Sequence, residues 1–346
     1  MEGFYHIFKS TGASLKTSVL SAFVCFIWAR PLLAQEGFPL YSEYINGNPY
    51  VAHPSMAGNR LTGFRLISSL RGQWLNQPNA PKLLLFTSEY SFSSRSKVGL
   101  QLFSDQNGYH IRKGTYITYA HHISFQDAVW NTKRAFTTRN DKLKELYFGL
   151  SIGNLQNRFN TEFYDLNTND PLVGTAGQNI SFFNVDAGFS FLTTQWFIHL
   201  TIKNLLKSPF QTTSSISPQE VATLAFRRLL VGVGYTYYAK TDWSIQSSVL
   251  FQTAEITNEK IVDLNLKLYR YIRTNRVWIG VSYRKDFNGL RTNTEDVGEK
   301  ISMEWFTPLV GINYKQFSFS YNYAQMTHQP NFTSTGIHQL SFGISF

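Results

Sequence analysis

The residues best suited to catalysis or metal binding are not spaced for either role. His121 and His122 are adjacent, and neighbouring side chains of a strand point to opposite faces, so they cannot bind one metal together. Ser341 and His338 lie three positions apart on one expected strand and face opposite ways, which excludes a nucleophile–base pair. Motifs of serine hydrolases, zinc proteases, thiol redox proteins and phosphate-binding loops are absent. The sequence therefore predicts no catalytic residue, no metal site and no cofactor.

The elements that position the polar side chains are strands, because apolar residues recur with a period of two. Residues 196–203, 262–268, 317–323 and 340–346 each alternate apolar with polar or small side chains. One face of each segment is apolar and rich in aromatic residues, and the other carries charges, amides and hydroxyls. We expect an all-β chain.

Length and composition favour a membrane barrel over a soluble sandwich. The 346 residues are 43% hydrophobic, 16% aromatic and 16% charged, with a net charge of +10 and no apolar run long enough for a spanning helix. The apolar rows extend over about nine to eleven residues, which is the length of a tilted membrane-spanning strand. Aromatic residues lie near the ends of these rows, as in the interfacial girdles of outer-membrane barrels: Trp74, Tyr90, Trp196, Tyr237, Trp243 and Tyr283.

The alternating segments predict a transmembrane antiparallel β-barrel of about 14 strands. An even count places both termini on the periplasmic side of the outer membrane. The connections are expected to alternate between short periplasmic turns and long extracellular loops, including 154–181 and 285–303. Residues 125–144 break this alternation with a long basic connection, which is either a solvated loop or a contact for a periplasmic partner. We expect Phe346, at the end of an alternating strand, to form part of the signal for membrane insertion.

The N-terminal part of the chain predicts export. Lys9 and Lys16 precede a short apolar stretch and a small residue, so residues 1–34 are interpreted as a signal peptide. Residues 35–60 then form a periplasmic or plug segment, and residues 61–346 form the barrel. Cys25, the single cysteine, lies within the signal peptide.

The inner face of the expected barrel carries charges. Arg65 and Glu89 are nearly symmetric about the first turn and are expected to form an ion pair across the strands in the lumen. A barrel of this size encloses more space than its own side chains fill, so water, a loop or the N-terminal segment must occupy the lumen. The expected inward residues favour a polar interior over the apolar path of a fatty-acid transporter: Arg65, Arg71, Glu89, His199, Lys203, Arg228, Asp263, Lys267 and Arg284.

A series of short motifs resembles a known family. The order is 39–44 (PLYSEY), 53–58 (HPSMAG), 71–74 (RGQW) and 80–82 (APK), and later segments near 169–171, 184–189, 203–206 and 336–341 also fit. Together they resemble the PorP/SprF family of type IX secretion system membrane proteins of Bacteroidetes. His53 stands where that family usually has Asn, and Asn79 where it has Gly. The matching positions selected as plug or partner contacts are Pro54, Ala57, Gly58, Arg71, Gln73, Trp74, Ala80 and Pro81.

The resemblance implies a non-enzymatic outer-membrane barrel that assists protein export and surface anchoring. Its expected partners are a secreted adhesin or other cargo with a type IX C-terminal sorting domain, periplasmic type IX components and outer-membrane lipid. We expect no nucleic-acid partner. Two other functions stay open: a channel or porin for polar solutes, and a passive structural barrel or surface lectin. For each motif position the simpler role is structural, since Pro and Gly fix turns and polar residues line a wet lumen.

Overall fold

The computed structural model describes residues 40–73, 80–107, 110–125, 144–159, 179–206, 227–239, 242–255, 259–291, 300–327 and 336–346. The predicted residues Trp74, the basic connection 126–143 and the signal peptide therefore lie outside the described part of the chain. Among the described residues, no helix is long and apolar enough to cross a membrane.

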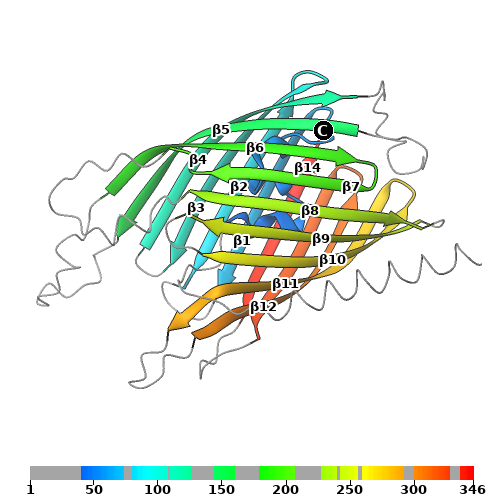
Figure 1. The fold of residues 1–346 in the computed structure, drawn as a ribbon. Helices are drawn as coiled ribbons and strands as arrows, with labels where there is room; N and C mark the ends of the chain where they lie inside the picture. The colour runs from blue at the N-terminus through cyan, green and yellow to red at the C-terminus, as the bar shows by residue number, and fades with distance from the viewer. Residues whose placement is uncertain are drawn as a thin grey trace, which may run out of the picture.

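Fourteen antiparallel strands form one closed barrel (Figure 1), which confirms the predicted fold and strand count. Each strand pairs with its neighbours in sequence, and β1 closes the barrel by pairing with β14. The strands are β1 Phe64–Gln73, β2 Lys82–Ser91, β3 Ser96–Asn107, β4 His110–Ser124, β5 Lys144–Phe159, β6 Asn179–Thr193, β7 Trp196–Lys203, β8 Arg228–Tyr238, β9 Trp243–Ala254, β10 Lys260–Ile272, β11 Asn275–Arg291, β12 Lys300–Tyr314, β13 Phe317–Met326 and β14 Ile337–Ser345.

The outer surface of the barrel is apolar because alternate residues of each strand point outward. On β2, Leu84 is 52% exposed whereas its neighbours Leu83 and Leu85 are buried. The same alternation leaves large apolar side chains exposed on strands all around the barrel, including Ile117, Leu150, Ile198, Leu266, Ile279, Val310 and Leu340. A continuous apolar surface of this kind is suited to lipid and not to water. Tyr90, Trp196, Tyr237 and Trp243 are exposed at strand ends.

The two ends of the barrel differ in their connections. At one end, called the turn end here, two residues join β6 to β7, β10 to β11 and β12 to β13, and the chain enters β1 from the same end. At the opposite loop end, β5 and β6 are joined by 160–178, and β7 and β8 by 204–227. The strands reach farther toward the loop end than expected. The interpretation of Asp286 as a loop residue was wrong, because Asp286 lies on β11 with its side chain buried.

The interior combines a polar wall with an apolar layer. The inward residues expected from the sequence are buried in the lumen, among them Glu89, His199, Asp263 and Lys267. The polar interior expected from the sequence is only part of the lumen, since inward residues of seven strands also form an apolar cluster near the loop end. It consists of Leu83, Leu85, Phe103, Tyr116, Leu155, Phe182, Leu230 and Leu250 together with Val51 and Ala52 of the N-terminal segment.

Candidate functional site

The N-terminal segment lies inside the barrel and forms the centre of the candidate site (Figure 1). This plug, residues 40–61, contains three 3-10 helices: η2 Leu40–Asn46, η3 Pro49–Val51 and η4 Pro54–Met56. Proline begins η3 and η4, because its fixed φ suits the first turn and it has no N–H to leave unpaired. Gly47 and Gly58 adopt left-handed φ angles of 94° and 63°, where the chain turns between segments.

One side of the plug is bonded to strand β10. Asn265 donates a hydrogen bond to the Tyr44 hydroxyl over 2.8 Å, and Tyr44 donates to Asp263 over 3.3 Å. Asp263 is also held by Arg284 on β11 in a buried ion pair of 2.5 Å. Lys267 donates to the Ile45 carbonyl over 2.5 Å. Asp263 and Lys267 therefore both have partners in the plug.

The middle of the plug is bonded to the opposite wall. The Tyr50 hydroxyl lies 2.8 Å from Thr118 Oγ1 on β4, and Lys203 on β7 donates to the Val51 carbonyl over 3.0 Å. His53 Nδ1 lies 2.8 Å from Thr201 Oγ1, and its ring stacks on His199 at 4.5 Å between centroids. Burial, together with His199 and Lys203, holds the pKa of His53 well below its usual value. Burial thus favours the neutral form of His53 in the folded protein.

Two glycines form a seat for helix η4. Gly149 on β5 is paired with Gly188 on β6, and both face the plug. A Cβ at Gly149 would overlap the backbone of Pro54 and Ser55, and one at Gly188 would lie 3.1 Å from Pro54 Cδ. The Ser55 hydroxyl lies 2.6 Å from Ser190 Oγ. The plug therefore packs backbone against strand at this seat.

A buried carboxylate joins the plug to the first hairpin. Arg65 and Glu89 are directly opposite each other on β1 and β2, and Arg65 donates from Nε over 2.8 Å and from Nη2 over 2.6 Å. The Gly58 N–H donates to the same carboxylate over 2.5 Å. Glu89 thus joins a strand to the plug, and all three residues lie near the turn end.

The family-motif positions fall into two groups. Pro54, Ala57 and Gly58 lie in the plug, and Arg71 on β1 reaches it by donating to Ser42 Oγ over 3.3 Å. Gln73, Ala80 and Pro81 lie together at the loop end of the first hairpin, where the Gln73 N–H donates to the Pro81 carbonyl over 3.0 Å. Phe346 exchanges backbone hydrogen bonds with Phe64 where the barrel closes.

Several residues of this site were not predicted from the sequence. Tyr44, Tyr50 and His53 anchor the plug, and Gly149 and Gly188 receive it. Glycine at inward positions of two paired strands was the available signal, because it marks a close approach of another backbone.

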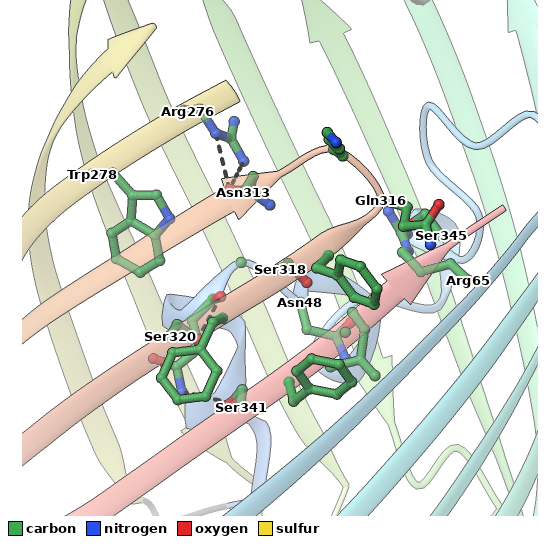
Figure 2. Close-up of a pocket in the computed structure, with 18 residues that line it drawn as sticks. Asn48, Arg65, Arg276, Trp278, Asn313, Gln316, Ser318, Ser320, Ser341 and Ser345 are labelled. Atoms are coloured by element: carbon green, nitrogen blue, oxygen red, sulfur yellow. Dashed lines mark hydrogen bonds between the residues drawn. The ribbon is translucent and has the colours of Figure 1, made fainter. Parts of the chain in front are cut away.

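A cavity of about 170 Å³ lies beside the plug at the turn end (Figure 2). Plug residues 46–48 form one side, and the facing wall comes from β1 and β11–β14. Short side chains leave space for the cavity on that wall, at Ser318, Ser320 and Ser341. Positive charge on the same wall comes from Arg276 and Lys315. Arg276 donates to Asn313 Oδ1 from Nε over 3.3 Å and from Nη2 over 3.1 Å.

The described residues offer no arrangement for catalysis or metal binding. No group of three His, Cys, Asp or Glu side chains among them is placed to hold a metal ion. His121 and His122 point to opposite sides of β4: His121 lies 3.0 Å from Ser96 Oγ, and His122 stacks on the inward Tyr147. In the described part of the chain, the site is formed by contacts between the plug and the barrel wall.

Comparison with protein families gives one match that covers nearly the whole chain. The family described as type IX secretion system membrane protein PorP/SprF matches residues 34–344. No curated protein sequence matches the chain.

Solved structures with a related shape are distant. CdiB from Acinetobacter baumannii has 9% identity and a TM-score of 0.39, and the match covers 82% of this chain and 60% of that one. The translocator domain of autotransporter NalP from Neisseria meningitidis has 10% identity and a TM-score of 0.32, with 88% and 96% coverage. The TodX monoaromatic hydrocarbon channel deltaS2 mutant has 10% identity and a TM-score of 0.46, with 82% and 89% coverage. Likeness at this level carries no information on function.

Proposed function

Because the chain belongs to the PorP/SprF family of type IX secretion system membrane proteins, we propose that it assists the export and surface anchoring of a partner protein. The partner is a secreted adhesin or related cargo that bears a type IX C-terminal sorting domain. In this proposal the barrel is not an enzyme, and it lies in the outer membrane with its apolar outer surface in lipid.

The filled lumen is the observation that carries this proposal. The plug contacts strands on opposite sides of the barrel, and an apolar layer packs against it toward the loop end. An open channel for polar solutes needs a continuous wet path, which these two layers obstruct. The role of the protein is therefore assigned to its surfaces and not to passage through its centre.

The proposed orientation places the turn end in the periplasm. The barrel both begins and ends at the turn end, which agrees with an exported chain whose signal peptide is residues 1–34. The long connections at the loop end then face outward, where a surface adhesin would be held. Periplasmic type IX components are the proposed partners of the turn end.

Affinity purification from native outer membranes in mild detergent, followed by mass spectrometry, tests this function. We expect recovery of a large surface protein with a C-terminal sorting domain or of periplasmic type IX components. A deletion strain should also lose that protein from its surface. Recovery of the barrel alone, with unchanged secretion in the deletion strain, would overturn the proposal.

Planar bilayer recordings of the purified protein test the channel alternative. The plugged lumen predicts no steady conductance. Steady, ion-selective conductance by the unmodified protein would favour the channel for polar solutes.

A further inference from the structure

The connections of the turn end carry an excess of positive charge. Arg95, Lys144, Arg273 and Lys315 are all exposed there, while Asp242 is the only carboxylate in the described connections of this end. In the described part of the loop end, ion pairs such as Arg112–Asp105 and Lys285–Glu304 join cations to carboxylates. A surface of one sign attracts partners of the opposite sign.

The cavity beside the plug adds a concave feature to this charged end (Figure 2). Arg276 and Lys315 line it, and no acidic side chain does. Asn313 and the face of the Tyr269 ring, 5.1 Å from the guanidinium carbon, hold Arg276 in place. No described residue accepts a hydrogen bond from Arg276 Nη1. A planar guanidinium fixed in this way suits a carboxylate.

Asn48, on the plug side of the cavity, is buried and bonded to the wall. Its side chain lines the cavity, is 4% exposed and donates from Nδ2 to Thr87 Oγ1 over 3.0 Å. Its Oδ1 is buried without a hydrogen-bond partner among the described residues. Because this atom has almost no exposed surface, a ligand in the cavity does not reach it, and Asn48 serves to fix the plug to β2.

We infer that the turn end is a docking surface for an acidic peptide segment of a periplasmic protein, with part of that segment in the cavity. A carboxylate of the segment pairs with Arg276 and Lys315 in the cavity. The exposed cations of the surrounding connections attract the remaining acidic residues. This inference rests on the proposed function only for the orientation that places the turn end in the periplasm.

A peptide fits the cavity better than an anionic lipid headgroup. Strands β13, β14 and β1 are paired continuously along the wall at this end, so the cavity is separated from lipid on the outer surface.

Binding of fluorescein-labelled hexaglutamate to the full chain in zwitterionic detergent tests the inference. We expect binding that weakens with salt and that is about fivefold weaker in the double variant Arg276→Gln/Lys315→Gln, because each exposed pair contributes modestly. The matched control is Lys82→Gln/Lys113→Gln, which removes the same charge from the loop end and should change the Kd less than twofold. Lys315→Gln alone, in an exposed turn, provides a variant whose fold is preserved.

Three outcomes overturn the inference. The first is equal weakening by the turn-end and loop-end variants, which would mean attraction by net charge alone. The second is unchanged binding in the turn-end variants. The third is that the cavity binds lipid. This would be shown if nanodiscs rich in phosphatidylglycerol abolished hexaglutamate binding and if the turn-end variants retained less phosphatidylglycerol than the unmodified protein. Normal cargo secretion in a deletion strain would contradict the proposed function but would leave this binding result intact.

Discussion

Gly149 on β5 leaves no room for a side chain, because the backbone of Ser55 in the plug lies directly against it. The paired Gly188 on β6 continues the same surface, and Ser190 next to it bonds the Ser55 hydroxyl. The backbone of the plug therefore packs directly against the wall, and a single added methyl group at this position would displace the plug.

Substituting Gly149→Ala should loosen the plug. The added Cβ overlaps backbone atoms that cannot rotate away, and overpacking of this kind costs about 1–3 kcal/mol. We expect a lower thermal unfolding midpoint and intermittent ion conductance in planar bilayers. The control is Gly232→Ala, also inward, where a Cβ would meet its nearest neighbours at an ordinary 3.5 Å. Identical behaviour of the two variants would contradict the close fit of the plug.

Substituting Glu89→Gln should destabilise the turn end. Glu89 is 1% exposed, and its change leaves Arg65 without its charged partner and weakens the bond from Gly58. We expect a loss of about 2 kcal/mol, below the 3–5 kcal/mol of fully buried pairs because the Arg65 side chain keeps 24% exposure. The loss is measured by urea unfolding in detergent.

The partly exposed pair Arg112–Asp105 serves as the control for Glu89. Its side chains are 30% and 21% exposed, so Asp105→Asn should cost less than about 1 kcal/mol. Equal losses in the two variants would show that burial does not strengthen the Arg65–Glu89 pair.

The stability of the plug should fall as the pH falls. The pKa of His53 is lowered in the folded protein, so the unfolded chain binds more protons near its ordinary value of about 6.5. The contribution is fully present above that pH and is lost below it. The facing charged and titratable groups are His199 and Lys203 on β7 and Asp186 on β6, which is paired with Lys203. Lowering the pH from 7.5 to 5.5 should reduce the unfolding midpoint more in the unmodified protein than in His53→Asn.

Truncating inward leucines should be as costly as in a soluble core. Leu85 is buried in the apolar layer above the plug, whereas Leu84 on the same strand is exposed on the outer surface. We expect Leu85→Ala to lose about 2–5 kcal/mol and Leu84→Ala considerably less. Equal and small losses on urea unfolding would mean that the lumen is wet at this level and not packed.

The sequence was sufficient for the barrel but not for the contents of its lumen. Alternation in segments such as 262–268 gave strand positions and faces, because lipid and lumen demand opposite side chains. The inward Leu83 and Leu85 were missed as a layer because strict alternation treats every inward position as polar. The cross-strand proximity of Arg65 and Glu89 follows from the hairpin register, which is local in the chain. The contacts of Tyr44 with Asp263 and Asn265 join residues more than two hundred positions apart, and no local pattern specifies them.

The closure between the first and last strands constrains how this chain can fold. Ser69 on β1 bonds Ser341 on β14 across 272 residues, so the cylinder cannot close until the whole barrel sequence is present. The plug immediately precedes β1 and bonds strands on both sides of the interior, so it must be enclosed as the cylinder forms. The entropy of joining such distant segments is lost late, and contacts of this range are associated with slow folding. The contacts of the plug with the wall join similarly distant segments, as Tyr44 and Asp263 do across 219 residues, so we expect them to form late as well.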